Sequence, residues 1–422
     1  MLYFLTSQHE VQEIVDMVDP NEFVKVMEHH WTGCLGNVSS EPLRKLWHRM
    51  AYMFGSYAVG YTHKNKWTVL QPPTGSGKTE GTMVYCSMLS VAAKDFYPGV
   101  LIVTRLKTDA DHIADRINEL TENMSEADKH SISVVGINAG KLPCPINKRS
   151  GIISEAVAYH GDTKGKLNTS DLKNYPVLVI THKAHELAMD SLEQDGDMRQ
   201  TWPYFSNWKN SKRRLIIIDE ALDIVKHSKA ELDKLRQTEA TLSQSMRERF
   251  SKEVQCLNEV IDVLSNYEKK TRKKTIKDHR VVDDCIKSNK AISFSGLRQA
   301  MRKETRYDLK LLCKTDNKEQ QRLREIHDAI MEDLEDIVQS WVYYAHVNGQ
   351  PTLNTARLII PDYMQGAAVL DATAGRNVMY ELFPPANVEP IPKDSRNYQN
   401  VTLHISRDHN LGSGYMKDKA KE

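Results

Sequence analysis

The residues best suited to chemistry in this chain form one short glycine-rich segment before a helical pattern. Its glycines let backbone N–H groups turn toward an anion. The lysine can reach the β- and γ-phosphates of a nucleotide, and the last threonine can ligate Mg²⁺. The apolar run Trp67–Leu70 precedes the segment, so a strand, a loop and a helix follow in the order that a phosphate-binding loop needs. Pro72 occupies the first glycine position of that pattern, and a plain glycine turn is the alternative. The segment consists of Thr74, Gly75, Ser76, Gly77, Lys78 and Thr79.

A second segment places two carboxylates at the end of an apolar run. Residues Arg214–Glu220 read Arg-Leu-Ile-Ile-Ile-Asp-Glu, which is typical of a central strand in a parallel sheet. Ligands of open α/β sheets bind at the carboxyl ends of such strands. We therefore expect Asp219 to hold the Mg²⁺ shell and Glu220 to orient and polarise an attacking water. A strand that ends in a solvated acidic turn is the alternative.

Together these segments resemble a known family. Pro73–Thr79 and Asp219–Leu222 look like motifs I and II of the superfamily 2 DExD/H-box helicases and translocases. Val100–Arg105 resembles motif Ia, and Val177–His182 resembles a later strand-end motif. Val369–Ala374 resembles motif III, with Asp371 in place of its usual serine. The five matches fall in the family's order and cover residues of about 65 to 224 and 355 to 380.

The resemblance implies a function and a set of residue roles. It implies a motor module that hydrolyses ATP with Mg²⁺ to move on or unwind nucleic acid, DNA in preference to RNA. Lys78, Asp219 and Glu220 would be catalytic, with Thr79 and Asp219 on the metal. By the same resemblance, Thr104, Arg105, Thr181 and His182 would contact the nucleic-acid backbone, and Asp371 and Thr373 would couple nucleotide state to strand grip.

Composition sets limits on these expectations. The chain has 422 residues, 40% of them hydrophobic and 27% charged, with a formal net charge of +1. It is not a polycation, so nucleic-acid binding must use local basic patches. Its six cysteines form no C-x-x-C pair, which favours reduced thiols and a cytoplasmic location. Only Cys86 and Cys144 lie between motifs I and II, too few for the iron–sulfur cluster of some relatives. No apolar run approaches a membrane span, so we expect no membrane partner.

The alternation of predicted strands and helices indicates an α/β fold with a mostly parallel sheet. The resemblance implies that it is a RecA-like P-loop NTPase domain, with a large α-helical insertion between motifs II and III. The predicted boundaries are an N-terminal helical segment (1–60), the ATPase domain (61–224), the helical insertion (225–344), a return to the ATPase domain (345–384), and a linker or the start of a further domain (385–422). Beyond Trp67–Leu70, the strands are expected at Leu101–Thr104, Ile132–Val135, Val177–Ile180, Leu215–Ile218, Ala368–Leu370 and Val401–Ile405. A hairpin is expected from Trp341–Val347 and Arg357–Pro361, with its turn at Asn348-Gly349.

A basic run, Lys269–Arg280, lies between the helical patterns of the insertion. It carries seven basic residues against Glu268 and Asp278 at its edges. A solvated loop is one interpretation. A patch that follows a phosphate backbone is the other.

A motor of this family needs two RecA-like domains, and fewer than fifty residues follow Thr373. We therefore expect a second RecA-like domain in cis or in trans as a partner, with weak ATPase activity and no unwinding by this chain alone. A nucleotide-dependent nucleic-acid-binding or scaffold subunit without turnover is the rival hypothesis. A phosphate-loop ATPase outside nucleic-acid work is a third, which the Thr104-Arg105 and Thr181-His182 pairs disfavour.

Overall fold

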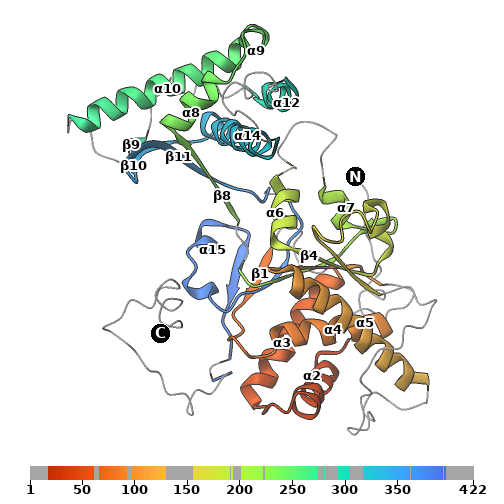
Figure 1. The fold of residues 1–422 in the computed structure, drawn as a ribbon. Helices are drawn as coiled ribbons and strands as arrows, with labels where there is room; N and C mark the ends of the chain where they lie inside the picture. Colours follow the sequence, from red (N-terminus) through yellow and green to blue (C-terminus); the bar gives the residue numbers. More distant parts are fainter. Residues whose placement is uncertain are drawn as a thin grey trace, which may run out of the picture. The chain divides into compact units, whose positions relative to one another are not determined.

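The structure is a computed structural model in which the chain divides into two compact units. The first unit is Met1–Leu222 with Asp362–Glu422, and the second is Asp223–Pro361. Figure 1 shows the elements of both. The described residues are 18–60, 66–92, 97–129, 155–190, 192, 201–221, 224–273, 280–281, 292–304, 317–361, 363–392 and 394–395.

A seven-stranded parallel sheet forms the centre of the first unit. Its central strands are buried along their whole length because they are continuous runs of apolar, largely β-branched residues. β12 lies between the first strand and the strand of the two carboxylates, so the ends of all three lie at the same edge of the sheet. The strand order is β13 (Ala386–Glu389), β1 (Trp67–Leu70), β12 (Ala368–Leu370), β7 (Leu215–Asp219), β2 (Val100–Thr104), β4 (Val177–Thr181) and β3 (Ala156–Tyr159).

Helices cover both faces of this sheet. One face, carrying Leu70, Ile102 and Ile217, packs in a single core with helices α2 to α5. α6 lies on the other side, against β2 and β4 (Figure 1). The fold of this unit is thus an α/β fold with a RecA-like parallel sheet, as the sequence predicted. Its helices are α2 (Pro20–His29), α3 (Glu41–Ala58), α4 (Lys78–Ala92), α5 (Lys107–Lys129), α6 (His182–Asp190), α7 (Trp202–Ser206) and α15 (Met379–Leu382), with short turns η1 (His30–Cys34), η3 (Thr169–Asn174) and η4 (Ala374–Arg376) and a small hairpin, β5 (Asn207–Trp208) and β6 (Ser211–Lys212).

The N-terminal helices begin at capping residues that can be read from the sequence. Asp19 accepts the amides of Asn21 and Glu22 at the start of α2, and Ser40 accepts the amide of Leu43 at the start of α3. A proline near the start of each helix adds a preset φ. The apolar stripe of α3 is fully buried, which fixes this helix firmly against the core.

Arg213 closes the other end of the sheet. Its side chain is fully buried just before β7, within hydrogen-bonding distance of five backbone carbonyl oxygens. Burial lowers the pKa of this guanidinium to about 10. Buried charges cost several kcal/mol unless hydrogen bonds satisfy them, and here main-chain oxygens do so. Those oxygens belong to Val100, Leu172, Tyr175, Pro176 and Phe205.

The second unit combines helices with an antiparallel sheet. Its strand order is β8 (Val225–Glu231), β11 (Gln350–Leu358), β10 (Tyr343–Val347) and β9 (Arg280–Val281). Leu235, Leu257, Leu334 and Leu353 belong to its separate hydrophobic core. Its helices are α8 (Leu232–Ala240), α9 (Gln244–Arg249), α10 (Ser251–Arg272), α12 (Ser295–Glu304) and α14 (Asn317–Gln339).

This unit differs from the all-helical insertion expected over residues 225–344. It extends to Pro361, and the predicted hairpin belongs to it. The turn of the hairpin is confirmed, since Asn348 and Gly349 both have positive φ between β10 and β11, but the second strand begins at Gln350 and not at the expected Arg357. β8 was missed because its sequence, Val-Lys-His-Ser-Lys-Ala-Glu, holds a single β-branched residue.

Some of the other predicted elements are present in the structure, some strands were missed, and some predictions fall outside the described residues. The strands expected at β1, β2, β4, β7 and β12 are present, and α2 and α3 lie within the N-terminal segment predicted to be helical. Sequence reasoning missed β3 and β13, which have only four residues each. The expected strands Ile132–Val135 and Val401–Ile405, and residues 274–279 of the basic run, lie outside the described residues. Within the part of the chain that the structure describes, no helix has the length and apolar character to cross a bilayer.

Candidate nucleotide site

The glycine-rich segment forms a tight loop between β1 and α4. Gly75 and Gly77 have φ of +78° and +82°, a region that other residues enter only at a cost. A Cβ on Gly77 would also come within 2.9 Å of the side chains of Met27 and Trp31. The loop therefore requires glycine at Gly77 both for its backbone and for its packing.

The N-terminal helices support this loop from behind. The Trp47 indole of α3 donates to the carbonyl of Ser76 at 2.9 Å, and the Ser76 amide donates to the Pro73 carbonyl. The Ser76 hydroxyl is buried and makes no hydrogen bond in the structure. A buried hydroxyl without a partner marks a place where a ligand can supply one. Sequence reasoning did not find Trp47, because only the tertiary fold brings α3 to the loop.

Lys78, Thr79 and Asp219 meet at the edge of the sheet. The Thr79 hydroxyl donates to Asp219 Oδ2 at 2.8 Å, and Lys78 Nζ lies 2.9 Å from Asp219 Oδ1. The lysine contact is an ion pair without hydrogen-bond alignment. Both side chains are largely buried, with 15% of Lys78 and 9% of Asp219 exposed. α4 begins at Lys78, so its unpaired N–H groups and positive dipole end add to this site.

These residues fit a magnesium–nucleotide complex. Thr79 and Asp219 supply the hydroxyl and carboxylate oxygens that Mg²⁺ takes from protein, while Lys78 and the loop amides supply the positive groups for phosphates. The glycine cradle and the unbonded Ser76 hydroxyl suit the same ligand. The arrangement joins two motifs 140 residues apart at one carboxylate.

Glu220 turns sharply out of β7 toward the same site. Its φ is +74°, a left-handed backbone that costs about 1 kcal/mol or more for a residue with a side chain. Its carboxylate is half exposed, with oxygens 3.9 Å from Lys78 Nζ and 3.9 Å from Arg105 Nη1. Strained backbone of this kind collects at functional sites. Glu220 therefore lies beside Lys78 and Arg105 with its carboxylate accessible.

The residues predicted to touch nucleic acid occupy different environments. Thr104 and Thr181 face each other across β2 and β4 and are buried, and the Thr181 hydroxyl accepts the amide of Ala184 in α6. Arg105 is 74% exposed. His182 turns inward, and its Nε2 lies 2.9 Å from the Asp219 carbonyl oxygen. Burial lowers the pKa of His182, so its neutral imidazole donates from Nε2 to that oxygen. The nucleic-acid role of these residues stays a prediction.

Asp371 forms a closed polar cluster at the end of β12. Its Oδ1 accepts the amide of Thr373 at 2.8 Å and the Thr373 hydroxyl at 2.7 Å, and its Oδ2 accepts the Tyr380 hydroxyl at 3.0 Å. Burial and the Asp371 charge raise the pKa of Tyr380. A Cβ on Gly375 would come within 2.8 Å of the Gln71 side chain, so this segment packs on the residue that follows β1. The predicted coupling pair thus lies next to the phosphate loop, and its coupling role stays a prediction.

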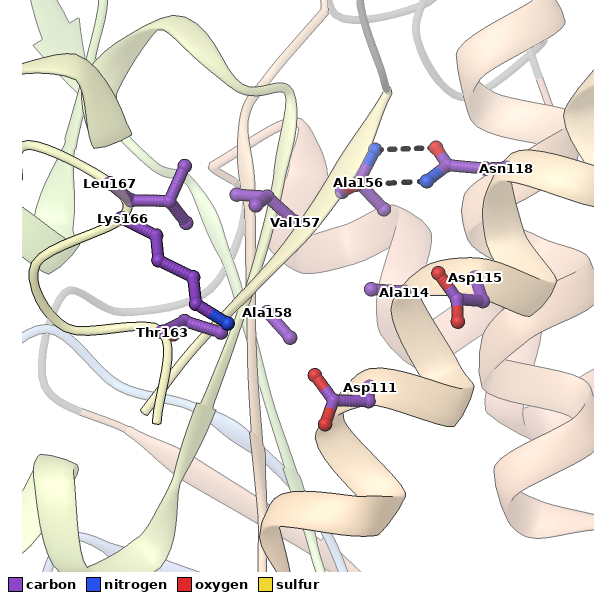
Figure 2. Close-up of a pocket in the computed structure, with 10 residues that line it drawn as sticks. All are labelled: Asp111, Ala114, Asp115, Asn118, Ala156, Val157, Ala158, Thr163, Lys166 and Leu167. Carbon is purple, nitrogen blue, oxygen red and sulfur yellow. Dashed lines mark hydrogen bonds between the residues drawn. The ribbon is translucent and has the colours of Figure 1, made fainter. Parts of the chain in front are cut away.

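A hollow lies at the sheet edge, between α5 and β3 (Figure 2). It is open to solvent, with a volume of about 290 Å³. Asn118 spans its end by pairing with both backbone groups of Ala156, at 2.9 and 2.8 Å, which closes the edge of β3 there. Asp111 holds His160 at 2.9 Å on its rim. The site residues predicted from the sequence line none of this hollow.

Comparisons with known proteins find distant structural similarity. No protein-family profile and no curated protein sequence matches the chain. Solved structures titled "XPD_APO", "Truncated XPD" and "XPD_Helicase" are similar, each with 12% sequence identity. Their TM-scores are 0.36, 0.34 and 0.36, over 77%, 77% and 80% of this chain. The matched region spans 53%, 92% and 58% of those chains, so the first and third extend well beyond it.

Proposed function

We propose that the first unit is an ATP-binding module that hydrolyses ATP with Mg²⁺ and acts as a motor on nucleic acid, as in a helicase or translocase. One observation carries this proposal: Lys78 and Thr79 of the glycine loop both contact the carboxylate of Asp219 at the end of β7. A plain glycine turn would not need that convergence, nor the strained backbone at Glu220.

Each residue has a definite task in this function. Lys78 leaves Asp219 to contact the β- and γ-phosphates, and the amides at the start of α4 bind phosphate oxygens. Thr79 and Asp219 hold the metal ion, which neutralises phosphate charge when bound. Glu220 orients the attacking water and takes up its proton. Its carboxylate lies 3.9 Å from Lys78 Nζ, too far for a direct hydrogen bond, which leaves it accessible to that water.

The nucleic-acid part of the proposal has separate support. Arg105 is exposed at the end of β2, next to Glu220, and can meet a phosphate backbone while its strand is fixed by the sheet. In the second unit, the last turn of α10 carries Lys269, Lys270 and Arg272. Basic groups of this kind bind a phosphate backbone without reading its sequence.

Nucleotide binding is the direct test. Lys78→Ala should weaken the affinity for a fluorescent Mg²⁺–ATP analogue by roughly 10- to 100-fold, because it removes a charge-assisted contact. Thr79→Val keeps the shape of the side chain and should remove most of the gain in affinity that Mg²⁺ provides. Equal affinities of wild type and Lys78→Ala would end the assignment.

A matched control is available in the second unit. Lys226 is as buried as Lys78, with 16% of its side chain exposed against 15%, and it also contacts carboxylates, on α14. Lys226→Ala should leave nucleotide affinity unchanged. If both variants lost affinity equally, the effect would come from general destabilisation instead of the phosphate site.

A further inference from the structure

The peptide group between Asp219 and Glu220 is held at both ends. Its carbonyl oxygen, on Asp219, lies 2.9 Å from His182 Nε2. Its N–H, on Glu220, donates to the Leu370 carbonyl at 3.1 Å. The two hydrogen-bond partners come from opposite sides of β7. His182 begins α6, which follows β4, and Leu370 ends β12.

The sheet itself leaves that carbonyl without a partner on one side. β2 pairs with β7 only as far as Val103 and Ile218, so the ladder between these strands stops one residue before Asp219. A buried carbonyl without a hydrogen bond costs roughly 1–3 kcal/mol. The imidazole of His182 takes the place that the next residue of β2 would otherwise fill.

The orientation of this peptide group determines where Glu220 points. The φ angle of Glu220 describes rotation about the bond between its N and Cα, relative to the preceding carbonyl carbon, and its value is +74°. A left-handed conformation persists only where surrounding contacts hold it. Here those contacts are the two hydrogen bonds, and they aim the carboxylate toward Lys78 and Arg105.

His182 is itself fixed in place. The Thr181 hydroxyl accepts the Ala184 amide and so defines the first turn of α6. Thr181 is also paired in register with Thr104 at the end of β2. The position of the imidazole is therefore set by the sheet and by the helix that follows it.

We infer that His182 is a positioning residue, whose hydrogen bond to the Asp219 carbonyl holds Glu220 in the left-handed turn that aims its carboxylate at the attacking water. The inference rests on the proposed function. It also gives the residue pair after β4 a task inside the nucleotide site.

The experiment compares two substitutions of similar size. His182→Leu removes the donor, whereas His182→Gln keeps an N–H group at nearly the same reach. His182→Leu should lower kcat on the order of 10-fold while nucleotide affinity stays unchanged, because Lys78 and Thr79 are intact. His182→Gln should restore most of the rate. His185→Leu is the control on the same helix, since His185 packs on Trp202.

A second measurement does not need turnover. Hydrogen exchange at the Glu220 amide should become about 10-fold faster in His182→Leu and should stay near the wild-type rate in His182→Gln, because the freed peptide loses its bond to Leu370 more often. Unchanged exchange in His182→Leu would overturn the inference. An equal loss of kcat in His182→Leu and His182→Gln would also overturn it. If the wild type binds nucleotide without hydrolysing it, the ATPase proposal fails while the exchange result still decides the role of His182.

Discussion

In the first unit, Lys78 and Asp219 meet where a loop and a strand end, whereas in the second unit Arg298 and Asp328 meet between two regular helices. The first pair lies beside a strained Glu220 backbone and a buried Ser76 hydroxyl without a hydrogen bond. The second pair has two aligned hydrogen bonds, at 3.0 and 3.2 Å. The same types of charged residue are thus used differently in the two units.

Several charged side chains of the second unit form a network of ion pairs and hydrogen bonds. Arg302 shares Asp328 with Arg298, and Arg298 also reaches Glu332 at 2.7 Å. Lys226 joins Glu332 to Asp336, which accepts the buried Ser228 hydroxyl and contacts Arg357. These neighbours lower the pKa of Asp328 and Asp336 despite burial. The difference teaches that charges which satisfy each other stabilise a fold, whereas charges beside strain and an unmatched polar atom indicate a ligand site.

Removal of the Glu220 carboxylate should produce the largest effect. Glu220→Gln keeps the size of the side chain and should retain nucleotide, while the hydrolysis rate falls by about two to four decades, because a positioned base is lost. Release of phosphate under single-turnover conditions measures this rate. Glu332→Gln, in the network of the second unit, is the control and should leave the rate unchanged. A wild-type rate in Glu220→Gln would favour the rival hypothesis of a binding subunit without turnover.

The second unit should respond in stability instead. Asp328→Asn breaks the carboxylate that two arginines share and should lower the free energy of unfolding by roughly 2 kcal/mol, less than for a fully buried pair because Arg302 is partly exposed. Chemical denaturation measures this change, and nucleotide affinity should not move. If Asp328→Asn weakened nucleotide binding at unchanged stability, the separation between the units' roles would be wrong.

Acid should act on the first unit through His185. Burial lowers the pKa of this imidazole from 6.5 to about 3, and its Nδ1 has no hydrogen-bond partner. The folded state keeps His185 neutral while the unfolded chain takes up a proton. Its contribution to stability is therefore complete above pH 6.5 and is lost as the pH falls toward 3, by up to about 1.4 kcal/mol per pH unit. His185→Leu should flatten the decrease in unfolding free energy between pH 6.5 and 5. An equally steep decrease in that variant would assign the effect to other groups.

Neutralising the basic C-terminal end of α10 should produce the smallest effect. Unlike the ion-pair network of the second unit, this segment should affect binding and not stability. Lys269, Lys270, Arg272 and Lys273 stand there against one acid, Glu268, which pairs with Arg272. Replacing Lys269, Lys270 and Lys273 by glutamine should weaken binding of a single-stranded oligonucleotide and flatten its salt dependence by up to about one unit per lost phosphate contact. Fluorescence anisotropy at several salt concentrations measures the slope. An unchanged slope would return this segment to a solvated surface.

The sequence predicted the parts of the molecule whose signals are local. The strands β2, β4 and β7 could be predicted because each is a continuous apolar run. The glycine loop and the two carboxylates could be predicted because their residue types follow apolar runs in a local pattern. The hairpin followed from Asn348-Gly349. In contrast, β8 was missed because its burial comes from α14 and not from its own hydrophobicity.

The second shell of contacts around the site could not be predicted in the same way. Trp47 reaches the loop only because α3 packs behind it. The contact of His182 depends on where the pairing of β2 with β7 stops, which no local pattern encodes. The resemblance implied a nucleic-acid contact for His182, which stays a prediction, but gave no sign of its contact with the Asp219 carbonyl oxygen.

The buried guanidinium of Arg213 has a consequence for how the first unit folds. Its acceptors come from segments between 8 and 113 residues away in sequence, so no local structure can satisfy it early. A sheet assembled without them would hold a cation in an apolar environment, which is costly. Formation of β2, β4 and β7 should therefore be a single late event, and partly assembled sheets should not accumulate. Amides of these three strands should open together in native-state hydrogen exchange, and opening of one strand alone would argue against a shared folding step.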